Sequence, residues 1–99
     1  MNRPDLQDAL RDRDAVLRAF VADDGSLRAI PTKVRKRLVI LDHLAQEFVP
    51  GVTYEETQVN RRLRAYHPDV AALRRYLVEE EFLERRDGVY WRAGGTVDV

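Results

Sequence analysis

The chain has 99 residues, of which 44% are hydrophobic and 34% charged, the size and composition of one globular domain. It contains no cysteine, which excludes disulfides, thiolate metal sites and cysteine nucleophiles. No stretch approaches the roughly 18 apolar residues of a membrane span, and the charged N-terminal residues lack the apolar run of a signal peptide. We therefore expect a cytoplasmic protein without a membrane partner.

The 17 basic and 17 acidic residues cancel in number, but they are distributed unevenly along the chain. Residues 1–24 carry four arginines and six aspartates, a balance of −2. Residues 25–78 carry ten basic and five acidic residues, a balance of +5, and residues 79–99 carry three and six, a balance of −3. A net charge of zero argues against a purely electrostatic DNA binder. The basic middle of the chain fits either an anionic partner or a solvated surface of mixed sign.

The first predicted element is a helix over Pro4–Ala22. Leu6, Leu10, Leu17 and Phe20 recur at helical spacing and form one apolar stripe. The stripe fits two arrangements, which the sequence leaves open. The helix either packs on the core of its own chain or forms the contact of a homodimer.

A turn and a short extended segment separate this helix from the next one. Asp23-Asp24-Gly25-Ser26 has the composition of a turn, and Leu27–Ile30 is extended because the following proline disfavours helical angles at Ile30. Thr32 is expected to cap a helix that ends near Phe48. The apolar stripe of this helix is wide, which indicates burial on two sides. Its members are Val34, Leu38, Ile40, Leu41, Leu44, Ala45 and Phe48.

Four basic residues crowd the first turn of this second helix: Lys33, Arg35, Lys36 and Arg37. Positive charge at a helix N-terminus opposes the helix dipole, so local stability does not explain the cluster. Two explanations remain open, namely an anionic partner and pairing with the acidic first helix.

The next two elements predict a short strand and a capped helix. Val52–Tyr54 falls where a winged helix places its first strand. Thr53 and Glu56 have the spacing of a capping box, which starts a helix over Tyr54–Ala65. The residues expected to face inward are Val59 and Leu63.

A tight break then leads into a further helix. His67-Pro68 ends the preceding helix, because the residue before proline disfavours helical angles. Pro68 and Asp69 suit the first turn of the next helix. The residues expected to face the core are Val70, Leu73 and Leu77. Those expected on the opposite face are Ala71, Ala72, Arg75 and Glu79, with Arg74 on the flank.

The C-terminal part predicts a β-hairpin. Asp87-Gly88 between Leu83–Arg86 and Val89–Arg92 is a strong signal for a two-residue hairpin turn. Tyr90 and Trp91 are expected to pack the hairpin onto the helices. The small, glycine-rich tail that follows is expected to be loose.

Taken together, the elements predict a mainly α fold with a small β-hairpin (α+β), a winged helix-turn-helix preceded by an N-terminal helix. Residues 1–22 form the N-terminal helix, residues 23–92 the winged-helix domain and residues 93–99 a flexible tail.

The sequence offers little of the chemistry that enzymes need. His43 and His67 are the only histidines, and no ligand spacing surrounds them. Glycine-rich phosphate loops and nucleophile motifs are absent from the sequence. We therefore expect neither enzymatic activity nor a cofactor or metal.

Five segments of the chain resemble a bacterial family called domain of unknown function 2087. They are Phe20 with Asp24-Gly25-Ser26-Leu27, then Ile30-Pro31-Thr32-Lys33, Tyr54–Asn60, Leu73–Val78 and Gly88–Arg92. The family occurs alone or behind an ArsR-type DNA-binding domain. The resemblance implies a winged-helix-like fold and a link to transcriptional control, and it implies no activity.

The predicted fold suggests a DNA-binding transcriptional regulator. In such motifs the second helix of the helix-turn-helix enters the major groove, and the wing and helix ends contact phosphate. Arg75 is best placed for a guanine contact. The predicted DNA-binding residues are Lys33, Arg35, Lys36, Arg61, Arg74, Arg75, Arg85 and Arg86.

A protein-interaction or dimerisation module without DNA contact is the alternative. The face around Arg75 otherwise carries alanines and glutamates, whereas typical DNA readers carry small polar residues there. In this alternative Arg74 and Arg75 pair with acidic groups, and Pro4–Ala22 forms the contact surface.

Overall fold

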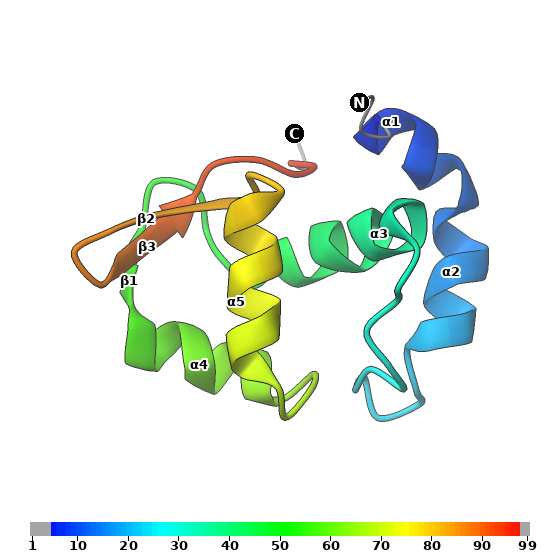
Figure 1. Ribbon diagram of the computed structural model, residues 1–99, viewed down its shortest axis with the longest axis horizontal. Coiled ribbons are helices and arrows are strands. Elements are labelled where there is room, and N and C mark those ends of the chain that lie inside the picture. Colours follow the sequence, from blue (N-terminus) through cyan, green and yellow to red (C-terminus); the bar gives the residue numbers. More distant parts are fainter. Residues whose placement is uncertain (1–4, 98–99) are drawn as a thin grey trace.

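The computed structural model describes residues 5–97, and their elements follow the predicted order (Figure 1). These are α1 (Leu6–Ala9), the 3-10 turn η1 (Leu10–Asp12), α2 (Arg13–Phe20), α3 (Val34–Ala45), β1 (Thr53–Glu55), α4 (Glu56–Arg64), α5 (Val70–Glu79), β2 (Leu83–Arg86) and β3 (Val89–Arg92). The strands form an antiparallel sheet in the order β1-β3-β2. The predicted α+β class, a helix-turn-helix with a hairpin wing, is confirmed. None of the helices between residues 5 and 97 combines the length and apolarity needed to cross a membrane.

Helix α3 lies at the centre of the molecule. The helices α1 and α2 pack on one side of it and α5 packs on the other (Figure 1). Leu38, Ile40, Leu41 and Leu44 are accordingly buried, so the burial on two sides expected from the wide stripe is confirmed. Val34 was expected to belong to this stripe, but it is 36% exposed because it begins the helix, before the packed turns.

The first helical segment is interrupted, whereas the sequence predicted one continuous helix over Pro4–Ala22. Arg35 donates from Nη2 to the carbonyl oxygen of Asp8 at 2.7 Å. A continuous helix would pair that oxygen with the N–H of Asp12, and the 3-10 turn lies here instead. The segment ends at Phe20, because Val21 is extended and forms a bridge with Leu27. Pro4 lies outside the described residues.

Two helix starts differ from those predicted. The residue that precedes α3 as its N-cap is Lys33, without a side-chain cap, so the prediction that Thr32 caps this helix is wrong. The capping box of α4 joins Glu55 and Gln58, with the Glu55 N–H donating to Gln58 Oε1 at 2.8 Å. The predicted box began at Thr53, but this residue belongs to β1 and pairs with β3, which delays the helix.

The turn between α4 and α5 forms the predicted helix-turn-helix. Asp69 is the N-cap of α5 and Pro68 precedes it, so neither is a first-turn residue as predicted. Ala72 was expected to be exposed, yet it is 8% exposed. With Tyr76 it forms a second row beside Leu73, because α3 packs against α5 here.

The hairpin begins and ends at the predicted residues. Asp87 and Gly88 have φ angles of 53° and 79°, the left-handed pair that a type I′ turn requires. Tyr90 faces the helices and is fully buried. Trp91 was expected to pack there too, but side chains alternate along a strand, and its Nε1 instead donates to Glu84 Oε2 at 3.0 Å on the outer face.

The segment after β3 is held in place, whereas the sequence predicted a loose tail over 93–99. Thr96 donates from its backbone N to Oδ1 of the buried Asp42 at 2.7 Å, and from its hydroxyl to Oδ2 at 2.9 Å. A buried carboxylate needs such donors, so Asp42 ties the segment to α3. Residues 98 and 99 lie outside the described residues.

Candidate nucleic-acid interface

The capping and burial of α5 determine which of its side chains face outward. The Asp69 side chain accepts a hydrogen bond from the backbone N–H three residues later, at 3.1 Å. Leu73 and Leu77 are fully buried and fix the rotation of the helix. Arg74 and Arg75 therefore emerge on its outer side.

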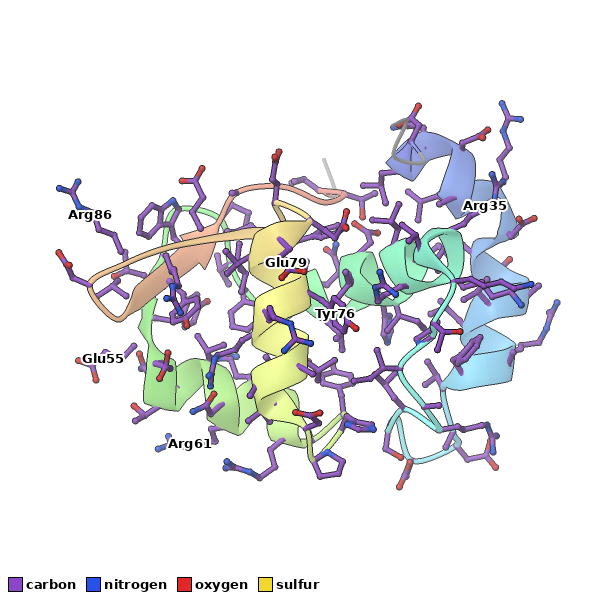
Figure 2. The ribbon with its side chains drawn as sticks, in the orientation of Figure 1. Arg35, Glu55, Arg61, Tyr76, Glu79 and Arg86 are labelled. Atoms are coloured by element: carbon purple, nitrogen blue, oxygen red, sulfur yellow. The ribbon has the colours of Figure 1, made fainter. Side chains whose placement is uncertain are left out.

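The wing brings a third arginine to the same side of the molecule. Arg85 lies opposite Tyr90 in the register of β2 and β3, so the two side chains share one face of the sheet. Arg85 Nη1 donates to the Tyr90 hydroxyl at 3.5 Å, and this contact raises the pKa of Arg85 above its ordinary value. Arg86 follows in the strand and points away from the helices at the wing tip (Figure 2).

A pocket of about 420 Å³ lies between α5 and the hairpin. It is lined by Ala71, Arg74, Arg75, Val78, Glu79, Arg85 and Tyr90. We refer to it as the helix–wing pocket. Both elements that winged helices present to DNA contribute arginines to it, and the lining carries three arginines against one glutamate. This arrangement suits an anionic ligand.

Arg74 forms the inner wall of the helix–wing pocket and is held by its neighbours. Its side chain is 20% exposed, its Nη1 donates to Asn60 Oδ1, and its Nε lies 3.8 Å from Glu56 Oε1. The same Glu56 oxygen accepts a hydrogen bond from the Tyr90 hydroxyl at 2.7 Å. This network joins α4, α5 and β3, so Arg74 contributes mainly to structure.

Arg75 is more exposed and more weakly held. Its side chain is 59% exposed, its Nε lies 3.8 Å from Glu79 Oε1, and its guanidinium lies 5.1 Å from the Tyr76 ring centroid. An exposed pair one helical turn apart contributes about 0.3–0.5 kcal/mol, which a ligand can replace. Arg75 and Arg85 are therefore the arginines of the pocket that keep most of their donors available.

The other predicted DNA-binding residues do not form one surface with the helix–wing pocket. Arg61, on α4, is exposed at the lower edge in Figure 2, and Arg86 projects from the wing tip. Arg35 lies at the opposite end of the molecule in the same view. The two lysines beside it, Lys33 and Lys36, line a groove against α2. The structure therefore separates the eight predicted residues into two groups.

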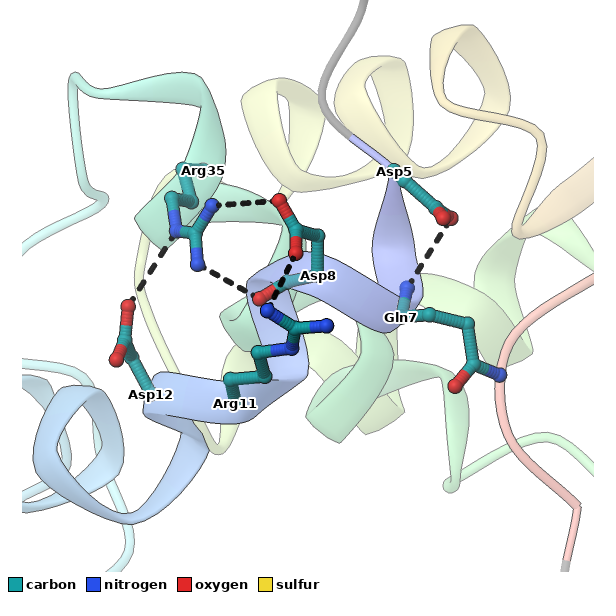
Figure 3. A network of polar contacts seen from close by, with 6 residues as sticks. All are labelled: Asp5, Gln7, Asp8, Arg11, Asp12 and Arg35. Atoms are coloured by element: carbon teal, nitrogen blue, oxygen red, sulfur yellow. Dashed lines mark hydrogen bonds and ion pairs between the residues drawn. The ribbon is translucent and has the colours of Figure 1, made fainter.

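Arg35 is held by the first helical segment (Figure 3). Its Nη1 lies 3.1 Å from Asp8 Oδ2 and its Nε lies 3.3 Å from Asp12 Oδ2. These contacts raise the pKa of Arg35, chiefly through the hydrogen bond to Asp8. Of the two explanations left open for the basic cluster, the structure shows pairing with the acidic first helix at Arg35.

Three residues of the site were assigned no role there from the sequence: Glu56, Asn60 and Tyr90. Glu56 and Asn60 are four residues apart on α4, so they share the helix face that meets Arg74. That spacing was visible in the sequence. What the sequence did not show is that β1, α4 and β3 converge at Glu56.

The comparison with known families agrees with this architecture. Residues 26–92 match the family described as "Uncharacterized protein conserved in bacteria", DUF2087. The chain belongs to this family. The matched region contains α3, α4, α5 and the whole sheet, and therefore the complete helix–wing pocket of this DUF2087 chain. Asp8 and Asp12, which hold Arg35, lie before the matched region.

One curated protein is similar beyond the family. The catalytic polypeptide of DNA polymerase epsilon from Emericella nidulans is 34% identical over 88 residues, which are 86% of this chain. The similar segment spans 4% of the polymerase polypeptide, so the likeness covers a small part of that enzyme. No solved structure matches the chain.

Proposed function

We propose that this chain binds double-stranded DNA as a winged helix and acts as a transcriptional regulator. The observation that supports the proposal is the helix–wing pocket, where Arg74 and Arg75 of α5 and Arg85 of the wing come together. A winged helix places its recognition helix in the major groove, with wing and helix termini on phosphates. Here α5 is the recognition helix.

The exposed arginines take different roles in this proposal. Arg75 is the candidate for a base contact, because it is the more exposed arginine of α5 and a guanidinium pairs with guanine through two hydrogen bonds. Arg61, Arg85 and Arg86 contact phosphate. Arg74 stays in its network with Asn60, and Lys33, Arg35 and Lys36 are not part of the contact surface that we propose.

Fluorescence anisotropy with a random-sequence duplex across a salt series tests this proposal. Four phosphate or base contacts by arginine predict that log K falls with log salt at a slope of roughly −3 to −4. Arg61→Gln should make the slope shallower by about one contact. The absence of binding at low salt with micromolar protein would contradict DNA binding.

The alternative, a protein-interaction module that dimerises through the first helical segment, is supported by a second observation. A groove of about 310 Å³ runs between α2 and the start of α3, with Ala15, Val16, Ala19 and Phe20 among its lining residues. Asp12 lines it from one element and Lys33 and Lys36 from another. A two-fold axis would bring these opposite charges of two copies together, which an isologous interface requires.

Light scattering over a range of concentrations tests the dimer. Ala19 is exposed in the groove, so Ala19→Glu should abolish a dimer formed there. Ala29→Glu, at an exposed position outside the groove, is the matched control and should leave the dimer intact. A native chain that stays monomeric throughout would refute the alternative.

A further inference from the structure

The helix–wing pocket carries an inference that deepens the proposed function and rests on it. We propose that this pocket is a subsite for a phosphate ester, in which Arg75 and Arg85 hold the phosphate from opposite walls. Arg75 belongs to α5 and Arg85 to β2, and both line the same cavity. Arg74 and the Tyr90 hydroxyl form the inner wall between them.

The charge balance of the site favours an anion. Arg74, Arg75 and Arg85 supply three positive charges, and the two carboxylates in contact with them, Glu56 and Glu79, supply two negative charges. Glu56 is occupied by Arg74 and by the Tyr90 hydroxyl. One positive charge therefore remains unbalanced at the cavity.

The geometry favours a phosphate group over a carboxylate. A carboxylate presents two oxygens in one plane, which a single guanidinium can satisfy. A phosphate is tetrahedral and presents oxygens in several directions, so it can accept hydrogen bonds from guanidinium groups on two facing walls. Arg75 and Arg85 come from two such walls, whereas Arg74 is committed to Asn60.

The size and lining of the pocket favour an ester. Its volume of about 420 Å³ lies within the range of small-molecule pockets, roughly 300–1,000 Å³, and exceeds the space that a bare phosphate ion fills. Ala71 and Val78 line it one and two helical turns apart on α5 and offer an apolar wall for the organic part. A phosphodiester of DNA and a free phosphomonoester share this chemistry.

Glu79 is the competing group within the pocket. Its Oε1 lies 3.8 Å from Arg75 Nε, in a pair whose side chains are both more than half exposed. A bound phosphate takes the place of Glu79 beside Arg75. Removing the charge at position 79 should therefore tighten phosphate binding several-fold.

Nitrogen-15 NMR of the full chain at constant ionic strength tests the subsite, with adenosine 5′-monophosphate as the probe and adenosine as the control ligand. The monophosphate should shift the Nε–H signals of Arg75 and Arg85 in a saturable manner, and adenosine should not. Equal shifts with the two ligands, or shifts that do not saturate, would overturn the proposal.

Neighbouring arginines of the wing provide a matched pair of variants. Arg85 faces the pocket and Arg86 points away from it, and both are exposed enough for replacement without loss of the fold. Arg85→Gln should weaken binding of the monophosphate about tenfold, the size of one charge-assisted hydrogen bond. Arg86→Gln should change it less than about twofold. Equal losses in the two variants would overturn the subsite, as would a failure of Glu79→Gln to tighten binding.

A parallel titration with duplex DNA separates the two proposals. If duplex binds and Arg85→Gln changes neither duplex nor monophosphate binding, the subsite is wrong and DNA binding stands. If the monophosphate binds as expected and duplex does not, DNA binding is wrong and the subsite takes a free phosphomonoester. Binding of both, with competition at constant ionic strength, supports both proposals.

Discussion

Two basic regions of this molecule look alike in the sequence and differ in the structure. The first is Lys33, Arg35 and Lys36 at the start of α3, and the second is the arginines of the helix–wing pocket. In the first, Arg35 contacts two aspartates of the first helical segment. In the second, Arg75 and Arg85 face an open cavity from two elements.

The difference comes from what surrounds each region. Asp8 is 27 residues before Arg35 and reaches it because α1 packs on α3. Arg85 instead meets a tyrosine hydroxyl whose proton is directed to Glu56, so its guanidinium is kept apart from a carboxylate. A basic cluster is thus available to a partner only where the fold supplies no acidic neighbour.

The largest expected effect concerns DNA binding. The double variant Arg75→Gln/Arg85→Gln should weaken duplex binding about 100-fold, since each charge-assisted hydrogen bond contributes about 1.5–3 kcal/mol. Lys33→Gln/Lys36→Gln, which removes the same charge from the other region, should weaken it less than about threefold. Fluorescence anisotropy measures both, and equal losses would show that the two regions do not differ in function.

A second experiment compares adjacent residues of α5. Arg74→Leu should lower the free energy of unfolding by about 1–3 kcal/mol, because Glu56 and Asn60 lose a partner in a part-buried network. Arg75→Leu, whose side chain is 59% exposed, should change it by no more than about 0.5 kcal/mol. Urea denaturation gives both values, and similar losses would mean that Arg74 has no special structural role.

A third experiment tests whether Arg35 is structural. Arg35→Gln should raise the rate of amide hydrogen exchange in residues 5–12, because it removes the contacts to Asp8 and Asp12 that hold this segment on α3. Arg11→Gln is the control, since Arg11 is 78% exposed and contacts Asp8 at 3.4 Å. Unchanged exchange in Arg35→Gln would return Arg35 to the residues available for a ligand.

The smallest expected effect depends on pH. Burial lowers the pKa of His43 below its ordinary value of 6.5, with a further contribution from the charge of Arg13. The folded state therefore holds fewer protons at His43 than the unfolded state does, and stability should fall as the pH drops below about 6.5. Thermal unfolding between pH 5 and pH 7 should show a weaker pH dependence in His43→Gln. An identical pH dependence in native chain and variant would contradict this assignment.

Local signals predicted the elements well. The hairpin strands were predicted residue by residue, because Asp87-Gly88 adopts left-handed angles that few other residue pairs accept. The burial of Leu38, Leu41 and Leu44 followed from helical spacing. Each of these features depends on residues close together in the chain.

The errors occurred where distant segments meet. The capping box of α4 was placed two residues early because β1 pairs with β3, more than 30 residues later. The first helix was predicted as continuous because the contact between Arg35 and Asp8 is non-local. For the same reason the sequence predicted Arg74 and Arg75 as site residues, but it gave no means of distinguishing the anchored one from the exposed one.

Arg92 links the wing to the end of α3, with a consequence for how the molecule unfolds. Its Nη1 donates to the carbonyl oxygens of Ala45 and Phe48, both at 2.9 Å, so a strand residue satisfies groups that the end of a helix leaves without partners. Opening of the hairpin would expose these carbonyls. We therefore expect the wing and α3 to form one cooperative unit, whose amides exchange with solvent at similar rates, rather than a mobile arm on a rigid body.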